Sequence, residues 1–390
     1  MKSTQIILGL VIFVAACGDP LHTDPQTPTG VGGGMRAAVM PANGVAANIT
    51  YDGGEAASHI ETGWPAGGTH VGKQFDANPH LGDAIVATFT WRGSTNTITT
   101  VTDHLEDGTP VGNTYTLVDY VTADGWSTAT YVATNVRNFP YPALTPDKVL
   151  AVHAIFSNVI SDASEMISAY RGVDPVTAVA LGAHSAASGS GASTTIAAAG
   201  LISVDAGAAV YAHTWASTVV DDTSPAGFTP ITQTWDAGFT SGKQEGDYLL
   251  GMATGTVEPR WTWSFTAPST WFANGLALNP QIATHLVFAV QPSYTPLPGA
   301  PITPSVRLAV VDDQGNTATG FAGTVSITLG HDASMLQNAH LTGTTVVTVT
   351  NGIATFTDLG VDEPGKGYTL RATAGPLTGA TSSPFSVTVP

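Results

Sequence analysis

The sequence predicts an all-β protein, and three observations support this class. The 390-residue chain contains 43 glycines and 25 prolines, which are the residues that join short strands through tight turns. Only 11% of its residues are charged, against roughly 25% in an average soluble protein, so few positions suit long amphipathic helices. Short segments rich in Val, Thr and Ala, bounded by turn residues, recur from about residue 84 to the end.

The charge balance limits the classes of partner. Asp and Glu number 29 against 12 Lys and Arg, for a formal net charge of −17. A nucleic-acid-binding protein needs a basic stripe, and so does a protein held electrostatically on anionic lipid. We therefore expect no nucleic-acid partner, and solubility outside the cell explains the acidity better than a role in binding cations.

Residues 281–390 predict a separate seven-stranded sandwich. Asn351-Gly352 separates two of its β segments, and this dipeptide is the strongest short-range signal for a hairpin. Seven short strands in about a hundred residues are typical of an immunoglobulin-like (Ig-like) sandwich. The expected strands are 286–290, 305–311, 325–329, 345–350, 353–356, 368–372 and 385–389.

Four segments of this region carry a resemblance. "LVFAVQP", "VVDDQGNTATGFAGTVSITL", "NGIATFTDL" and "GKGYTLRATA" resemble the bacterial Ig-like repeats of surface and adhesin-type proteins. The resemblance implies a stalk, spacer or adhesive unit without catalytic residues, and it implies that Tyr368 is the corner tyrosine of the sandwich. Asp312, Asp313 and Asn316 in one turn are candidate ligands of a structural calcium ion, although such residues are also ordinary in turns.

Residues 37–280 predict one large sandwich, because about a dozen short strands follow one another without a long linker. We expect a jelly-roll or concanavalin-like fold here, with Gly82-Asp83 and Gly246-Asp247 opening corresponding strands. "GNTYTLV", "SAYRGVD" and "SGSGAS" resemble a jelly-roll module of bacterial extracellular proteins, a resemblance that implies no activity.

The only cysteine of the chain, Cys17, follows an N-terminal apolar run of signal-peptide length. The sequence Val14-Ala15-Ala16-Cys17 resembles the lipobox of bacterial lipoproteins. The resemblance implies a signal peptide over residues 1–16 and acyl chains, palmitate among them, on Cys17. Residues 17–36 are then a disordered tether rich in Pro, Gly and Thr. The alternative is an ordinary signal peptide that happens to contain a cysteine.

The envelope location follows from the same segment. A lipidated Cys17 places the protein in the bacterial cell envelope with the membrane as a partner. An aspartate directly after the cysteine retains some lipoproteins at the inner membrane, but here Gly18 follows Cys17 and the aspartate comes one position later. The outer membrane is therefore favoured.

Catalytic motifs give no candidate. The nearest match to Gly-x-Ser-x-Gly, Gly125 to Ala129, ends in Ala and precedes no predicted helix. His59, His70 and His80 are about ten residues apart, which favours solvated loop histidines over a zinc site. We expect no catalytic residue and no cofactor other than the structural calcium considered above.

Trp261 and Trp263 alternate with polar residues, so they point to the same face of a strand. An exposed row of this kind, with Trp126 as a further candidate, would stack on sugar rings, whereas a buried row is sandwich core. The sequence thus predicts a membrane-anchored surface lipoprotein with a non-catalytic binding, adhesive or structural role. The alternatives are a carbohydrate-binding protein, with a glycan or cell-surface protein as partner, and a glycan-active enzyme with paired carboxylates in a cleft.

Overall fold

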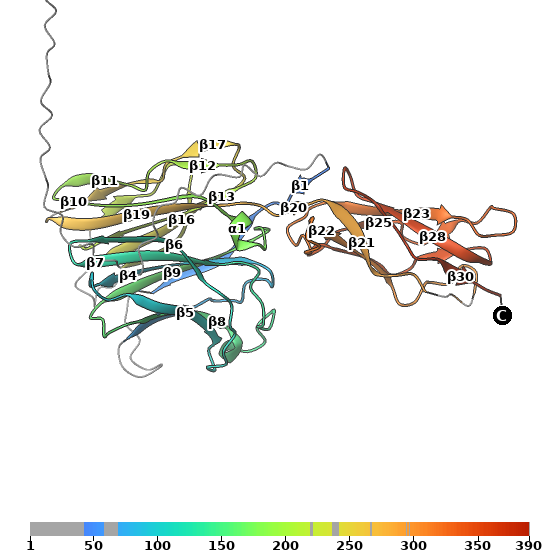
Figure 1. Ribbon diagram of the computed structural model, residues 1–390, viewed down its shortest axis with the longest axis horizontal. Helices are drawn as coiled ribbons and strands as arrows, with labels where there is room; N and C mark the ends of the chain where they lie inside the picture. Colours follow the sequence, from blue (N-terminus) through green and yellow to red (C-terminus); the bar gives the residue numbers. More distant parts are fainter. Residues whose placement is uncertain are drawn as a thin grey trace, which may run out of the picture. The chain divides into compact units, whose positions relative to one another are not determined.

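A computed structural model describes residues 43–57, 69–218, 221–235, 242–265, 267–293, 295 and 297–389. Within these ranges every pair of named strands is antiparallel, which confirms the all-β class (Figure 1). The helices of the described residues are α1 (Thr177–Ala180) and the 3₁₀ helix η1 (Pro146–Lys148). Neither approaches the length and apolar character that a membrane-crossing helix needs.

Strands β2 to β9 form one sandwich, here called the first jelly roll. Its five-stranded sheet has the order β2-β9-β4-β7-β6, and its three-stranded sheet has the order β3-β8-β5. The bounds are β2 (Thr50–Ala57), β3 (His70–Gln74), β4 (Ala84–Arg92), β5 (Ile98–Leu105), β6 (Thr116–Ala123), β7 (Trp126–Ala133), β8 (Leu150–Phe156) and β9 (Ala163–Arg171).

Strands β10 to β19 form a second sandwich, the second jelly roll. Its sheets have the orders β10-β19-β13-β16-β15 and β11-β18-β14, and β12 pairs with β17. The bounds are β10 (Leu181–Gly191), β11 (Thr194–Ala198), β12 (Ile202–Val204), β13 (Ala209–Ala216), β14 (Asp221–Thr223), β15 (Thr229–Trp235), β16 (Lys243–Leu249), β17 (Gly255–Val257), β18 (Arg260–Ser264) and β19 (Ser269–Leu278).

The two jelly rolls share one topology. Without β12 and β17, each jelly roll has eight strands, which we number 1 to 8 along the chain. In both jelly rolls the larger sheet then has the order 1-8-3-6-5, and the smaller sheet has the order 2-7-4. The single sandwich expected for residues 37–280 is therefore resolved into two. The proposed correspondence of Gly82-Asp83 with Gly246-Asp247 is wrong. The counterpart of β4 is β13, and Gly246 lies inside β16, the counterpart of β7.

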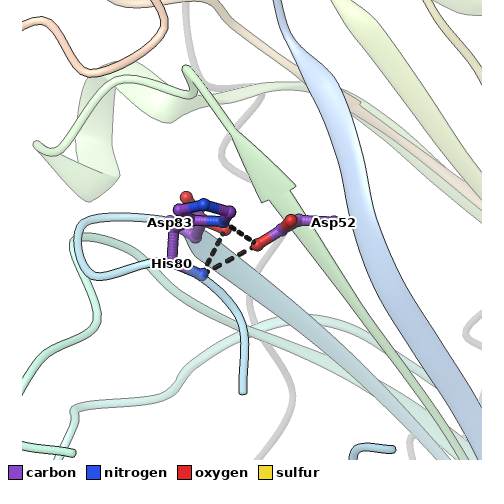
Figure 2. A group of neighbouring side chains, drawn as sticks. All are labelled: Asp52, His80 and Asp83. Atoms are coloured by element: carbon purple, nitrogen blue, oxygen red, sulfur yellow. Dashed lines mark hydrogen bonds and ion pairs between the residues drawn. The ribbon is translucent and has the colours of Figure 1, made fainter. Parts of the chain in front are cut away.

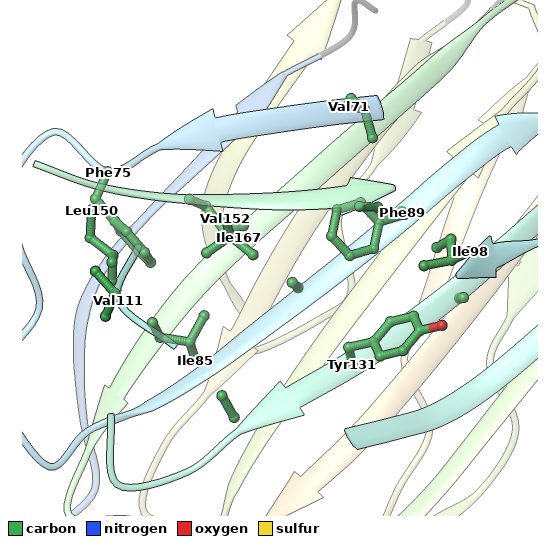
Figure 3. Close-up of a cluster of buried hydrophobic side chains, with 14 of the residues drawn as sticks. Val71, Phe75, Ile85, Phe89, Ile98, Val111, Tyr131, Leu150, Val152 and Ile167 are labelled. Carbon is green, nitrogen blue, oxygen red and sulfur yellow. The ribbon is translucent and has the colours of Figure 1, made fainter. Parts of the chain in front are cut away.

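A continuous core fills the space between the two sheets of the first jelly roll (Figure 3). Every second residue of β8 faces this core, among them Leu150 and Val152, as the two-residue period of a strand requires. Ile85 and Phe89 of β4 and Ile167 of β9 meet them from the larger sheet, and all of these side chains are buried. Figure 3 shows the two sets pointing toward one another.

The two five-stranded sheets also pack against each other. Val86 and Met166 of the first jelly roll share a buried cluster with Tyr211 and Leu276 of the second. Within it the Tyr211 hydroxyl donates to Thr88 Oγ1 at 2.8 Å. Figure 1 shows β13, β16 and β19 layered over β4, β7 and β9. Each five-stranded sheet is therefore covered on both faces, which explains why β4 is buried at eight of its nine residues.

The C-terminal region is a separate two-sheet sandwich with its own core. One sheet has the order β21-β22-β26, and the other has the order β25-β23-β28-β29 with β30 also on β28. The bounds are β1 (Val45–Ala46) and its partner β20 (Ile282–Ala283), then β21 (His285–Val290), β22 (Val306–Val311), β23 (Thr324–His331), β24 (Leu341–Thr342), β25 (Val346–Thr348), β26 (Ile353–Phe356), β27 (Gly360–Val361), β28 (Gly365–Thr373), β29 (Ala380–Thr381) and β30 (Phe385–Val387).

Two local predictions for this sandwich are confirmed. Asn351 and Gly352 both have positive φ, 52° and 73°, as a tight hairpin turn requires, and Thr350 and Ile353 exchange both backbone hydrogen bonds across it. The Tyr368 hydroxyl donates to the carbonyl oxygen of Glu363 at 2.9 Å. This contact to the backbone a few residues upstream is the geometry of a corner tyrosine.

Candidate functional site

A β-bulge in β2 presents the first residue of the candidate site. The register of β2 against β9 shifts between Tyr51 and Gly54, and Gly53 at the bulge has a φ of 110°, a conformation that favours glycine. A Cβ on Gly54 would lie 2.7 Å from the carbonyl oxygen of Ile167, so the close approach of the strands also requires glycine. Bulges of this kind redirect a neighbouring side chain, here that of Asp52.

A tight turn before β4 supplies the other two residues. The backbone N–H of Asp83 donates to the carbonyl oxygen of His80, and Gly82 in the turn has a φ of 95°. The turn is held in place by Asn78, whose side chain donates to the carbonyls of Pro140 and Lys148 and accepts from the N–H of Leu150. His80 and Asp83 therefore come from a well-anchored loop.

Asp52, His80 and Asp83 form a compact cluster (Figure 2). One ligand atom from each lies within 4.8 Å of the other two. Asp52 Oδ2 accepts from the backbone N–H of His80 at 2.7 Å and lies 2.8 Å from His80 Nδ1. Asp83 Oδ2 is 3.2 Å from the same backbone nitrogen. On the other side of the ring, His80 Nε2 lies 2.6 Å from the hydroxyl of Tyr141.

The two carboxyl groups have opposite pKa shifts. Burial, the hydrogen bond with Asp52 and the charge of Asp52 raise the pKa of Asp83 to about 9. Burial also favours the neutral form of Asp52, but hydrogen bonds from Asp83 and His80 outweigh it and lower the pKa of Asp52. With no cation present, the pair therefore shares one proton at neutral pH, carried by Asp83.

A groove of about 680 Å³ lies beside this cluster. We call it the acidic groove; it is lined by Tyr51, Asp52, Glu55, Asp76, Asn78 and Tyr141, among others. Glu55 and Asp76 form a second carboxyl pair. Burial and the hydrogen bond with Asp76 raise the pKa of Glu55, while Lys73, 3.6 Å away, acts in the opposite direction.

A second cluster, the histidine row, lies on one face of the three-stranded sheet. His70 of β3, His153 of β8 and His104 of β5 follow a diagonal across three adjacent strands, and all three are buried. The rings of His104 and His153 stack with centroids 4.1 Å apart, and those of His70 and His153 are 5.9 Å apart. A Cβ on Gly72 would lie 2.0 Å from His153 Nδ1, so glycine leaves room for that ring.

The expectation of a solvated loop histidine is therefore wrong for His70, which is fully buried in a strand. His80 lies in a loop and is partly exposed, as expected, but its ring is held by Asp52 and Tyr141. His59 lies outside the described residues. The partners of His80 come from residues 28 and 61 positions away. The spacing of residues in the sequence therefore could not reveal these partners. The local signals in the sequence are Gly53-Gly54, which mark the bulge of β2, and Gly82, which marks the turn before β4.

The predicted tryptophan row is part of the core. Trp261 and Trp263 are 0% exposed and Trp126 is 7% exposed. Trp261 Nε1 donates to Asp247 Oδ2 at 2.9 Å, Trp263 Nε1 donates to Thr214 Oγ1 at 3.2 Å, and Trp126 packs against Trp215. None of the three candidates presents a ring to solvent, so they are not a platform for a sugar.

The remaining predicted site residues lie elsewhere. Asp312 is buried, and its carboxylate accepts hydrogen bonds from the backbones of Gln314 and Asn316 and from the side chains of Asn316 and Gln281. These donors satisfy the carboxylate within an Asx-type turn, and Asp313 is exposed. The lipidation candidate Cys17 and the tether to residue 36 lie outside the described residues.

Comparisons with known proteins add little. No protein-family model matches the chain, and no curated protein matches it. Among solved structures, a chain of the Sputnik virophage, determined by cryo-EM at 3.5 Å resolution, is similar over 68% of this chain and 91% of that chain. The sequence identity is 9% and the TM-score is 0.14, and a similarity of this size carries no argument about fold or function.

Proposed function

We propose that this protein is a membrane-anchored bacterial surface lipoprotein with a non-catalytic binding, adhesive or structural role. The observation that carries the anchor is the sequence Val14-Ala15-Ala16-Cys17, followed by a tether rich in Pro, Gly and Thr. Several acyl chains on one cysteine hold a protein on a membrane far more durably than one chain. The all-β sandwiches that follow are the kind of module such a tether displays.

Replacement of the cysteine tests the anchor. Cys17→Ser removes the only thiol of the chain, and we expect the variant to leave the membrane fraction. Thr23→Ser in the tether is the matched control and should stay in the membrane fraction. A Cys17→Ser protein that remains membrane-bound after a high-salt wash would contradict the proposal.

A second candidate function, glycan binding, is favoured by the acidic groove rather than by the tryptophans. Its lining combines Glu55 and Asp76, which accept hydrogen bonds from hydroxyl groups, with the rings of Tyr51 and Tyr141. A concave site with a few polar groups between aromatic walls is typical of small-molecule and sugar sites. We therefore expect a glycan to bind in the acidic groove and not at the tryptophan row.

A glycan array probed with the full chain tests this function. Glu55→Gln with Asp76→Asn should abolish any signal seen with the unchanged protein, and Asp147→Asn at an exposed carboxylate should preserve it. Signals that survive the double change would exclude the groove. Release of new reducing ends from a bound glycan would instead support the glycan-active alternative, because the paired carboxylates of the groove could then act as acid and base.

A further inference from the structure

The cluster of Asp52, His80 and Asp83 has the donor atoms of a metal site. Two carboxylates and one imidazole, one atom from each, lie within 4.8 Å of one another. They come from a strand and from a turn that are each fixed by backbone hydrogen bonds. Figure 2 shows the Asp52 carboxylate directed at His80 and Asp83. Acidic residues often cluster without an ion, and a buried carboxylate oxygen that no donor within the described ranges contacts distinguishes this cluster.

Asp83 carries this oxygen. Its side chain is 0% exposed, and its Oδ1 accepts no hydrogen bond from any of the described residues. Its Oδ2 lies 3.2 Å from the backbone nitrogen of His80, and the Asp83 carboxyl group also hydrogen-bonds with Asp52. A buried carboxylate oxygen without a donor is costly, so this group needs either a proton or a cation. Arg171 acts on Asp83 electrostatically, but no hydrogen bond joins their side chains among the described residues.

Tyr141 orients the imidazole. Its hydroxyl lies 2.6 Å from His80 Nε2, and the two rings pack with centroids 4.1 Å apart. The contact leaves His80 Nδ1 facing Asp52 Oδ2 at 2.8 Å. Metal-binding histidines are generally held in this way, with the second ring nitrogen bonded to a neighbouring polar group.

We propose that Asp52, His80 and Asp83 bind a divalent transition-metal ion of the Zn²⁺ or Mn²⁺ type. Calcium and magnesium take oxygen ligands, whereas an imidazole together with carboxylates suits transition metals. Three protein ligands leave further coordination positions for water or for an incoming ligand. Because Asp52 also lines the acidic groove, such a ligand would come from the groove. The inference does not depend on the lipid anchor or on glycan binding.

The alternative occupant is the proton shared by Asp52 and Asp83, and Asp83→Asn distinguishes the two. The amide reproduces the shape of the protonated acid and can donate to Asp52, but it is a poor ligand for a transition metal. The full chain in detergent is stripped with EDTA, dialysed and titrated with ZnCl₂, with binding followed by calorimetry and unfolding by the thermal midpoint. MnCl₂ and CaCl₂ are tested in parallel.

We expect the unchanged protein to bind one Zn²⁺ at this site and to unfold at a higher temperature in its presence, as binding to the native state requires. Asp83→Asn and His80→Gln should each weaken that binding at least tenfold. Tyr141→Phe should weaken it about tenfold, in line with the loss of an outer-shell partner. His340→Gln, at an exposed histidine of the C-terminal sandwich, controls for adventitious binding and should leave the affinity unchanged.

Two outcomes would overturn the inference. One is an unchanged protein whose thermal midpoint and heat of titration do not respond to Zn²⁺ or Mn²⁺. The other is a response that persists within twofold in both Asp83→Asn and His80→Gln, which would place the ion elsewhere. If Asp83→Asn does not fold, His80→Gln and Tyr141→Phe decide the question, since both leave the buried acid in place.

Discussion

Asp52 accepts two hydrogen bonds from one residue, His80, through the backbone N–H at 2.7 Å and through the ring Nδ1 at 2.8 Å. The ring contact requires the tautomer with a proton on Nδ1, and His80 Nε2 then accepts from the Tyr141 hydroxyl. Asp52 thus joins the bulge of β2 to the turn before β4. Asp52 and Tyr141, which contact the two nitrogens of the His80 ring, both line the acidic groove.

Asp52→Ala tests the strength of this link. The change removes the acceptor of the His80 ring and of the Asp83 proton, and it leaves the backbone N–H of His80 with only the longer 3.2 Å contact to Asp83. We therefore expect the free energy of unfolding in EDTA to fall by about 1–3 kcal/mol. Urea denaturation followed by fluorescence measures it. Asp147→Ala, at a side chain that is 56% exposed, is the control and should change stability by less than about 0.5 kcal/mol. Equal losses in both variants would contradict the buried link.

Trp263→Ala tests the assignment of the tryptophan row to the core. Removal of a fully buried indole should lower the free energy of unfolding by about 3–5 kcal/mol. Ile196→Ala on the neighbouring strand β11, where the side chain is 54% exposed, should cost far less. A Trp263→Ala protein as stable as the unchanged chain would show that the ring is not buried in solution.

The histidine row predicts a loss of stability in acid. Burial and the neighbouring charges of His104 and His70 lower the pKa of His153 to about 3, from 6.5. Between these values the unfolded chain binds a proton that the folded chain does not. The stability is therefore complete above about pH 6.5 and is lost as the pH falls toward 3, by up to roughly 1.4 kcal/mol per pH unit.

Urea denaturation at pH 7 and pH 5 measures this effect. His153→Gln should reduce the difference between the two pH values, and His340→Gln, at an exposed histidine, should not. If the unchanged protein and His153→Gln lose the same stability on acidification, His153 does not titrate as described.

Tyr368→Phe tests the corner of the C-terminal sandwich. The ring stays in the core, but the hydrogen bond to the carbonyl oxygen of Glu363 is lost, so we expect stability to fall by about 1 kcal/mol. Glu363→Gln keeps the carbonyl acceptor and should be close to neutral. Thermal unfolding of both variants gives the comparison, and equal midpoints would contradict a stabilising corner.

Local signals predicted the C-terminal sandwich well. All seven expected strands overlap observed ones, and among the described residues from 281 on the two-residue strands β20, β24, β27 and β29 were missed. Asn351-Gly352 marked its turn because few other dipeptides adopt two successive positive φ angles. Strands β23 and β28 alternate apolar and polar residues, so the period of the pattern was informative there.

The candidate site was not predicted, for physical reasons. Asp52 lies on β2, whose sequence TYDGGEAA has two glycines and no apolar period. The contacts of Asp52, His80 and Tyr141 join segments far apart in the chain. The alternation of Trp261 and Trp263 with polar residues is the same for an exposed row and for a buried row. Whether the rings are exposed or buried depends on how the sheets pack on each other, which the sequence of one strand does not show.

Mass spectrometry of the mature N-terminus tests the proposed lipid anchor at Cys17. The full chain is expressed in a bacterial host that processes lipoproteins, extracted with detergent and digested, and the N-terminal peptide is measured. We predict a peptide that begins at Cys17, lacks residues 1–16 and carries the added mass of acyl chains. A mature chain that begins at another residue, with an unmodified thiol at Cys17 or without Cys17, would contradict the account.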